Sequence, residues 1–465
     1  MLVVFAIAAS ACVGQRAESP SPVVRLDALD SFVADEMARQ RIPGCGIALL
    51  HRGEPVKVRG YGLANLEHDV AATSATIFQS GSMGKQFTAA LVMLLVEDGR
   101  LRLDESIATY LPTTPAALRA ITIRHLLNHT SGLADYTTES FDYRRDRTED
   151  ELLGLAFAQP LEFAAGARWS YSNTGYVILG ILAGKVGGRF YGDQLRDRIF
   201  APAGMKTAQI IDEAGIVPHR ADGYQLDGEV MKHHDWVAPT INTTADGALY
   251  YSIDDLVAWN QVLRSGAILR PESWDQVYAP ARLNSGKTFP YAAGWFVAPI
   301  NGHRVFRHGG AWQGFRTDLL RYPDDDVTVI ALCNLATAEP ERLTDGLAAL
   351  LDPSLAAPAL APIPDRDPAI TARLHGLLAA AAAGTLAATD FAGLRAGMFA
   401  HVQQLYPTLL GRLGAPTRVT LVSREELGDD VVFGYQVTYT TATFDVALAL
   451  GPDDKIASFR VRPRR

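Results

Sequence analysis

The chain has 465 residues and a net charge of −8, and 48% of its residues are apolar. This apolar fraction is typical of a globular protein and excludes a disordered or collagen-like chain. The acidic balance, with neither a Lys/Arg run nor a Cys-x2-Cys pair, argues against nucleic-acid binding and against zinc fingers. The length predicts roughly two or three domains.

The first residues predict export. Residues 1–11 read MLVVFAIAASA, an apolar segment about the size of a signal-peptide core that ends in small residues suited to a signal peptidase. Cys12 follows directly, so the stretch also resembles a bacterial lipobox whose cysteine is lipidated. We interpret residues 1–23 as an export segment with a linker. The protein is then expected to be periplasmic, secreted, or anchored to a membrane through Cys12.

Two further cysteines, Cys45 and Cys333, lie in the apolar runs GCGIALL and VIALCNL. Buried cysteines behave as small apolar side chains, so we expect two buried thiols rather than a disulfide. A chain of this size can build a core that needs no covalent staples.

The N-terminal elements are predicted as a helix and a hairpin. Residues 25–39 have apolar positions at helical spacing. Two strand-like runs, 46–50 and 56–62, are joined by a turn that contains Gly53. An uninterrupted helical pattern then covers residues 82–97.

The middle of the chain, about residues 100–265, shows loops and helices with few strand signals. Strand runs return after it, at 294–299, 304–307, 315–322 and 327–333, and a helix follows at about 339–351. This order predicts one α/β domain over residues 24–351, in which a helical region is inserted between the hairpin and the later strands.

The composition changes after this domain. Residues 352–368 contain five prolines and predict a linker. Residues 369–412 predict two or three Ala/Leu-rich helices, and residues 418–463 predict four strands separated by Gly/Asp turns. We therefore expect a separate α+β module over residues 369–465. Its generic pattern resembles NTF2-like or cystatin-like accessory domains.

The candidate nucleophile is Ser82, which precedes Lys85 by three residues at the start of a predicted helix. Residues at this spacing share a helix face, so the lysine can lie beside the serine hydroxyl. A partly desolvated lysine can lose its proton and activate the serine. The chain has only seven lysines, which makes a chance pair less frequent. A capping serine beside a solvated lysine remains the plain alternative.

Two more motifs carry weaker signals. Tyr171 and Asn173 lie in GARWSYSNTGY, where a phenol could relay a proton and an amide could bind a substrate carbonyl or amide. His308 and Gly310 lie in RHGGAW, where the histidine could orient substrate and glycine permits close backbone approach. A capped turn and a Gly-rich turn are the respective structural alternatives.

Taken in this order, the three motifs are similar to the Ser-x-x-Lys, Tyr-x-Asn and Lys-Thr-Gly set of penicillin-recognising serine enzymes. The chain resembles the class C β-lactamase-like and penicillin-binding-protein-like serine hydrolases over about residues 24–351. Other stretches carry the same resemblance: PGCGIALLHRGEPVKVRGYG, TIFQSGSMGKQFTAALVMLLVEDGRLRLDESI, ITIRHLLNHTSGL and GWFVAPINGHRVFRHGGAWQGF.

The resemblance implies a fold and a set of roles. The fold would be an antiparallel sheet flanked by helices with an all-helical insertion. Ser82 would be acylated, Lys85 would be the base, and Tyr171 would assist proton transfer. Asn173 would hold the substrate carbonyl or amide, and the N–H groups of Ser82 and Ala311 would form the oxyanion hole.

The third motif departs from the family pattern, because His308 stands where Lys is usual and Gly309 where Thr is usual. A neutral histidine holds a carboxylate less strongly than a lysine. His-x-Gly occurs in members that resemble esterases and D-aminopeptidases. This favours a small ester or a D-amino-acid peptide over a β-lactam as substrate. The alternative is a penicillin- or peptide-binding protein with little or no turnover.

The remaining histidines have simpler interpretations. His125 and His129 match a family segment near the cleft, where structural hydrogen bonding is favoured over catalysis. His233 and His234 could suggest a metal, but no third ligand stands at metal spacing, so a surface loop is favoured. Trp312 either lines the cleft or packs in the core. We expect no metal and no cofactor, and a small molecule or peptide as the partner.

Overall fold

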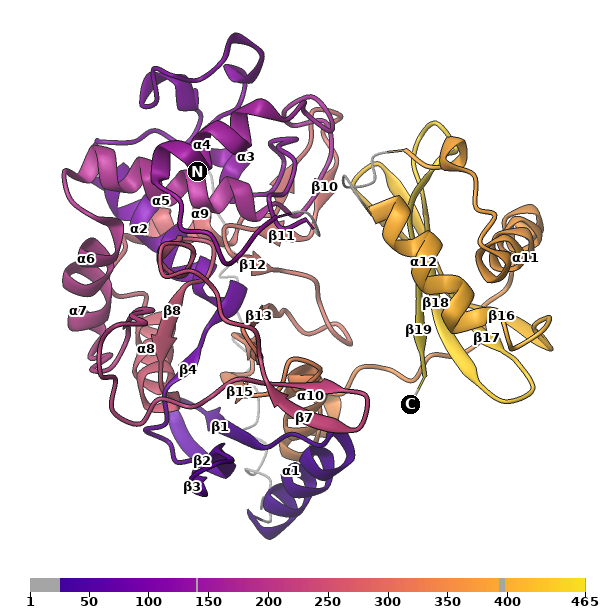
Figure 1. The fold of residues 1–465 in the computed structure, drawn as a ribbon, viewed down its shortest axis with the longest axis horizontal. Helices are drawn as coiled ribbons and strands as arrows, with labels where there is room; N and C mark the ends of the chain where they lie inside the picture. Colours follow the sequence, from indigo (N-terminus) through magenta and orange to yellow (C-terminus); the bar gives the residue numbers. More distant parts are fainter. Residues whose placement is uncertain (1–25, 139–140, 393–397, 465) are drawn as a thin grey trace, which may run out of the picture.

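The computed structural model describes residues 26–138, 141–392 and 398–464. The predicted export segment, residues 1–23, lies outside the described residues. Figure 1 shows a larger body that contains the candidate site motifs and a smaller C-terminal module beside it. Within the described ranges, no helix is both long and apolar enough to cross a membrane.

The larger body is built on an eight-stranded antiparallel sheet in the order β11-β12-β13-β14-β15-β1-β2-β3. Its strands are β1 (Gly44–His51), β2 (Glu54–Asn65), β3 (Val70–Ala71), β11 (Tyr291–Ala292), β12 (Trp295–Phe296), β13 (Phe306–Trp312), β14 (Phe315–Tyr322) and β15 (Val327–Cys333). The two halves of the sheet come from the two ends of the domain, because β1 of the N-terminal hairpin pairs with β15. This confirms the predicted antiparallel sheet with a long insertion.

Helices cover both faces of this sheet. The central strands β1 and β15 are buried along nearly their whole length, as their continuous apolar sequences require. One face packs against α1 (Leu26–Gln40) and α10 (Pro340–Leu351), and the other packs against α2 (Lys85–Glu97) and α8 (Ile253–Ser265). The sheet therefore separates two hydrophobic clusters, and the candidate site belongs to the α2 side.

The inserted segment is mostly helical. Its further helices are α3 (Ile123–Leu127), α4 (Glu149–Ala158), α5 (Asn173–Gly187), α6 (Tyr191–Leu195), α7 (Ala201–Ala203) and α9 (Pro271–Tyr278). Short strands that the sequence did not signal complete it: β4 (Phe78–Gln79), β5 (Gln209–Ile210), β6 (Tyr224–Asp227), β7 (Val230–His233), β8 (Leu249–Tyr251), β9 (Ala281–Arg282) and β10 (Thr288–Phe289). Each of these strands has only two to four residues, too few for a period-two pattern to be recognised.

Helix α2 runs through the middle of the body. Every residue from Lys85 to Leu95 is buried, so the helix is covered on all sides, which its apolar sequence permits. It packs against α5 and α9. The Ser-x-x-Lys pair at its start is thereby attached to the most enclosed helix of the domain.

The expectation of two free thiols is wrong. Cys45 and Cys333 are directly opposite each other on the antiparallel pair β1–β15, with their Cα atoms 4.2 Å apart, and the structure joins them in a disulfide. Their apolar surroundings were predicted correctly, since both residues are fully buried. Their pairing depends on the register between two strands whose cysteines are 288 residues apart in the sequence. The sequence around either cysteine gives no information about this register.

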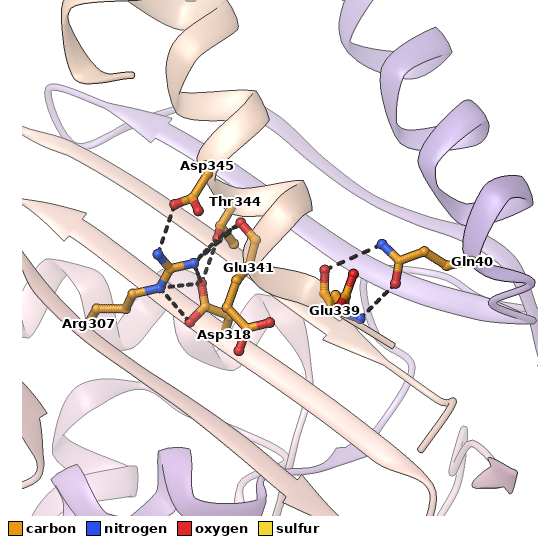
Figure 2. A network of polar contacts seen from close by, with 7 residues as sticks. All are labelled: Gln40, Arg307, Asp318, Glu339, Glu341, Thr344 and Asp345. Carbon is orange, nitrogen blue, oxygen red and sulfur yellow. Dashed lines mark hydrogen bonds and ion pairs between the residues drawn. The ribbon is translucent and has the colours of Figure 1, made fainter. Parts of the chain in front are cut away.

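A polar network fastens β13 to α10 on the face of the sheet away from the site (Figure 2). Arg307 donates from Nε to Asp318 Oδ1 at 3.0 Å and from Nη1 to Asp345 Oδ1 at 2.8 Å. Thr344 donates to the same Asp318 carboxylate at 2.5 Å. Successive side chains of a strand point to opposite faces, so His308, the next residue, faces the site. The network thus fixes the strand that carries the third motif.

The C-terminal module consists of helices packed on a four-stranded antiparallel meander in the order β16-β17-β18-β19. Its elements are α11 (Pro368–Ala383), α12 (Met398–Leu410), β16 (Arg418–Leu427), β17 (Asp430–Thr438), β18 (Thr443–Leu450) and β19 (Ile456–Pro463). The predicted helices and four strands are present. The resemblance to NTF2-like or cystatin-like domains stays a prediction.

Candidate active site

Ser82 lies in a 3-10 turn, η1 (Gly81–Gly84), that leads directly into α2. Residues three apart eclipse each other in a 3-10 turn, which brings the side chain of Lys85 to Ser82. The Lys85 Nζ to Ser82 Oγ distance is 3.1 Å. Gly81 has φ +51°, a left-handed conformation, and a Cβ on it would lie 2.3 Å from Ala311 N. Glycine is therefore required for η1 to pack this close to β13.

Lys85 is fully buried, and its Nζ contacts three oxygens. It donates to Asn173 Oδ1 at 2.7 Å and to the backbone carbonyl of Asp246, besides its contact with Ser82. The two carbonyl oxygens can only accept hydrogen bonds, whereas the Ser82 hydroxyl can also donate. When Lys85 is deprotonated, its two remaining N–H bonds suit the carbonyl oxygens and its lone pair faces Ser82. The arrangement directs proton transfer from this serine to this lysine.

Asn173 is held in the orientation that serves Lys85. Its Nδ2 donates to Asp135 Oδ2 at 3.2 Å, and this fixes Oδ1 toward the ammonium. Asp135 is buried, and it also accepts from the Asn173 backbone N–H and from Thr137. The structure thus gives Asn173 a role in placing the lysine. The amide still lines the cavity, where the substrate contact predicted for it is possible.

Tyr171 stands beside the same two groups. Its ring lies 5.1 Å from Lys85 Nζ, measured to the ring centroid. Burial raises the pKa of Tyr171 well above its ordinary value, and the Ser82 side chain, as a hydrogen-bond partner, acts in the opposite direction. Tyr171 is therefore a neutral phenol at physiological pH that can both accept and donate a proton.

The backbone of β13 passes beside Ser82 at Gly310. A Cβ on Gly310 would lie 2.0 Å from Ser80 O and 2.9 Å from Ser82 N, so only glycine fits there. The absence of a side chain on Gly310 thus allows β13 to pass this close to Ser82. The amide of the next residue, Ala311, is brought next to that of Ser82, as the predicted oxyanion hole requires.

His308 lies in β13 and is 2% exposed. Its Nδ1 is 2.6 Å from Gly309 O, and its Nε2 is 3.1 Å from Tyr291 Oη. A carbonyl can only accept, so Nδ1 carries the proton and Nε2 accepts from Tyr291. Burial, together with the charge of Lys85, lowers the pKa of His308 to about 3. His308 is a neutral, enclosed residue beside the site, and its contact with substrate stays a prediction.

His129 continues this chain of hydrogen bonds. Its Nδ1 accepts from the backbone N–H of Ser172 at 3.1 Å, so the proton of the neutral ring is on Nε2, which is 3.1 Å from Tyr291 Oη. The chain therefore runs from His129 through Tyr291 to His308, and connects the second motif to the third. This agrees with the structural hydrogen bonding predicted for His129.

A cavity of about 270 Å³ opens at Ser82. Its wall includes Tyr136, Tyr143 and Trp312, together with Asp246. Trp312 donates to Asn242 Oδ1 at 2.6 Å and so lines the cleft in a fixed orientation. Among the described residues, this wall contains no Arg, Lys or His.

Sequence reasoning missed Asp246 and Tyr291. Asp246 stands in TTADGALYY and Tyr291 in TFPYAAGW, and neither segment has a residue pattern that marks a site. His233 is exposed and His234 is half-buried, and His233 ends the short strand β7 instead of lying in a loop. No group of three His, Cys, Asp or Glu in the described ranges could hold a metal ion.

An antiparallel sheet with a Ser-x-x-Lys pair at the start of a central helix defines the class of β-lactamase- and transpeptidase-like proteins. The family model described as Beta-lactamase matches residues 29–352. The chain therefore belongs to the β-lactamase family.

The chain is similar in sequence to a penicillin-binding protein and to a D-aminopeptidase. The chain is 31% identical over 301 residues to Penicillin-binding protein 4* of Bacillus subtilis, which covers 61% of this chain and 66% of that protein. It is 28% identical over 321 residues to a D-aminopeptidase of Brucella canis, which covers 67% and 60% respectively. The chain thus spans less than two thirds of the length of these relatives.

Solved structures agree on the fold. D-amino acid amidase from Ochrobactrum anthropi, complexed with L-phenylalanine amide, aligns with a TM-score of 0.60 and 27% identity over 71% of this chain and 97% of that chain. The octameric penicillin-binding protein homologue from Pyrococcus abyssi aligns with a TM-score of 0.62 and 22% identity over 91% and 90%. The second alignment extends beyond the β-lactamase-related domain.

Proposed function

We propose that the protein is a serine hydrolase that cleaves an amide or ester through an acyl-enzyme on Ser82. The observation that carries the proposal is the contact of Lys85 Nζ with Ser82 Oγ, because Ser82 carries a proton that it can give up, whereas the carbonyl oxygens of Asn173 and Asp246 only accept. The related D-aminopeptidase and D-amino acid amidase favour a D-aminoacyl amide or peptide as substrate.

The proposed reaction follows from these contacts. Ser82 Oγ attacks the substrate carbonyl carbon and its proton passes to Lys85 Nζ, while the N–H groups of Ser82 and Ala311 stabilise the oxyanion. The bond to the leaving group breaks, and Tyr171 passes a proton to the departing nitrogen or oxygen. Water then attacks the acyl carbon, and its proton passes through Tyr171 and Lys85 back to Ser82 Oγ. The bond between Oγ and the acyl carbon breaks, which regenerates Ser82 and releases the acid.

The third motif supports this substrate class over a β-lactam. A β-lactam or a peptide C-terminus carries a carboxylate that a cation must hold. The enclosed, neutral His308 provides no such cation, and the described wall of the Ser82 cavity provides none either. A binding protein with little turnover remains the second candidate, because one relative carries the name of a penicillin-binding protein.

Export is part of the proposal. The disulfide between Cys45 and Cys333 favours an oxidising compartment, as does the signal-like sequence before Cys12. Cleavage and lipidation at Cys12 are both compatible with this.

The test combines turnover and labelling. Wild-type protein and Ser82→Ala are assayed with D-phenylalanine p-nitroanilide, a nitrophenyl ester and a chromogenic cephalosporin. A fluorophosphonate probe reports acylation of Ser82 by mass spectrometry. We expect turnover of an amide or ester that Ser82→Ala loses by at least about 1,000-fold. Equal turnover by both proteins would refute the assignment of Ser82, and stoichiometric acylation without turnover would establish the binding protein instead.

The role of Lys85 has its own variant. Lys85→Met is expected to lower kcat by about 100- to 10,000-fold, because general-base assistance contributes that much. Lys206→Met, at an exposed position, is the matched control. Wild-type rates in Lys85→Met would show that another group activates Ser82.

A further inference from the structure

One carboxylate faces the cavity beside Ser82 and is not used by the proposed reaction. Asp246 follows the 3-10 turn η5 (Ile241–Thr243) and precedes β8. Its backbone oxygen accepts from Lys85 Nζ, which is also 3.1 Å from Ser82 Oγ. The residue is therefore attached to Lys85 through its backbone, while its carboxylate is hydrogen-bonded to Tyr136 and Thr244, which line the cavity with it.

The carboxylate is held in place by two neutral donors. Tyr136 donates from its hydroxyl to Oδ2 at 2.8 Å, and Thr244 donates to Oδ1 at 2.6 Å. Each oxygen of a carboxylate can accept about two hydrogen bonds, so each retains acceptor capacity. Asp246 is partly exposed, and no ion pair joins it to a basic side chain among the described residues. It is a fixed negative charge that is open to a ligand.

Asp135 shows what a structural carboxylate looks like in the same neighbourhood. It accepts from the backbone N–H and the side-chain amide of Asn173 and from the backbone N–H and hydroxyl of Thr137, it is 7% exposed, and it does not line the cavity. Its acceptor sites are used by the protein. The two aspartates therefore differ in the hydrogen-bond acceptor capacity that they leave for a substrate.

The other residues of the cavity wall indicate which groups a ligand would carry besides its positive charge. Tyr136, Tyr143 and Trp312 supply aromatic surface, and Ile241 adds an aliphatic side chain. Aromatic faces attract both apolar groups and cations, so they suit an organic ammonium with an apolar substituent. The described wall offers no cation that would attract a carboxylate.

We propose that Asp246 binds the free ammonium group on the acyl part of the substrate. The enzyme would then act as an aminopeptidase, an amino-acid amidase or an amino-acid esterase. It would select aminoacyl compounds that have an unblocked amine and an apolar or aromatic side chain. This inference rests on the proposed function, and it names the group that selects the substrate.

The test compares a free amine with a blocked one. D-phenylalanine p-nitroanilide and its N-acetyl form differ in charge at the amine, so the ratio of their kcat/KM values measures recognition of the ammonium. An ion pair at a partly buried site accounts for about 10- to 100-fold in affinity. We expect wild type to prefer the free amine by at least tenfold, and Asp246→Asn to reduce that ratio by about tenfold or more. Asp254→Asn, an exposed aspartate on α8, is the matched control.

A binding measurement decides the case in which neither anilide is hydrolysed. D-phenylalanine amide and N-acetyl-D-phenylalanine amide are compared for protection of Ser82 against the fluorophosphonate. Stronger protection by the free amine in wild type but not in Asp246→Asn supports the inference. Equal protection, or the same substrate ratio in wild type and Asp246→Asn, overturns it and leaves the hydrolase assignment standing. Loss of Ser82 labelling itself refutes the proposed function.

Discussion

His308 is the residue at which the chain departs most clearly from the usual third motif, and the structure explains the departure by burial. The imidazole is enclosed between Tyr291 and its own strand, where a lysine would bring a second buried charge close to Lys85. Desolvation opposes such a charge. A neutral ring accepts a hydrogen bond from the Tyr291 hydroxyl instead, and this contact ties β13 to the segment that carries Tyr291.

This burial predicts a pH-dependent stability. The folded pKa of His308 is about 3, below the ordinary value near 6.5, so the unfolded chain binds a proton that the folded protein does not. The free energy of unfolding should therefore fall as the pH drops from about 6.5 toward about 3, by up to about 1.4 kcal/mol per pH unit. Urea denaturation between pH 6.5 and 5 checks this, in a range where carboxyl groups contribute less.

His308→Asn removes the titrating group, so the free energy of unfolding of this variant should fall less steeply over the same pH range. His68→Asn, at an exposed histidine, is the control and should retain the wild-type slope. Identical slopes in wild type and His308→Asn would mean that folding does not lower the pKa of His308.

The three motifs were enough to predict which side chains meet at the site. Ser82 and Lys85 could be placed because their spacing is local, and Tyr171 and Asn173 because the resemblance joined them to that pair. Asp246 could not be predicted, since its backbone contact with Lys85 spans 161 residues and no periodicity marks it. The proximity of Ser82 and Lys85 could be predicted from the sequence, whereas the position of Asp246 beside them required the fold.

Strands whose apolar runs are long were predicted closely. The runs at 315–322 and 327–333 correspond to β14 and β15, while β13 extends past the predicted 304–307 to Trp312. Its glycines interrupt the strand pattern, so the third motif was interpreted as a following turn. The Arg307 network and the close approach at Gly310 hold this glycine-containing segment in the sheet (Figure 2).

The pairing of β1 with β15 predicts that reduction weakens the domain. The disulfide closes a loop of 288 residues, and such a cross-link restricts the unfolded chain. Cys45→Ala combined with Cys333→Ala should lower the free energy of unfolding by about 2–5 kcal/mol, measured by guanidinium denaturation. Reductant should lower the stability of wild type similarly and leave that of the double variant unaffected. Alkylation of both cysteines in non-reduced wild type, detected by mass spectrometry, would contradict the disulfide.

The C-terminal module meets the larger body at a few specific contacts. The β16–β17 hairpin provides Gly428, in the turn, whose N–H donates to Thr288 O at 3.1 Å, and Asp430, the first residue of β17, whose carboxylate accepts from Arg168 at 3.1 Å. Between the two bodies is a cavity of about 580 Å³, and Tyr171 forms part of its wall. The module therefore borders the site on the side of Tyr171.

Its internal fold could be predicted because alternating strands and Gly/Asp turns are local signals. Its position could not, since the contact of Arg168 with Asp430 joins residues 262 apart across a proline-rich linker. A linker of this composition separates domains without fixing their angle. The contacts at the β16–β17 hairpin, among them the Lys287–Asp429 ion pair at 3.9 Å, join the two bodies in the arrangement that Figure 1 shows.

The Arg168–Asp430 ion pair predicts how firmly the module is docked. Both side chains are 25% exposed, so the pair should contribute about 1 kcal/mol, which is about a fivefold change in the docking equilibrium. Asp430→Arg adds repulsion and should increase the radius of gyration in small-angle scattering and the rate of proteolysis in residues 352–368. Arg168→Asp in the same chain restores opposite charges and should reverse both effects. Arg373→Ala removes the Arg373–Asp454 ion pair inside the module and serves as the control, because the docking surface is left intact. If Asp430→Arg scatters and is cleaved like wild type, contacts other than this ion pair hold the module.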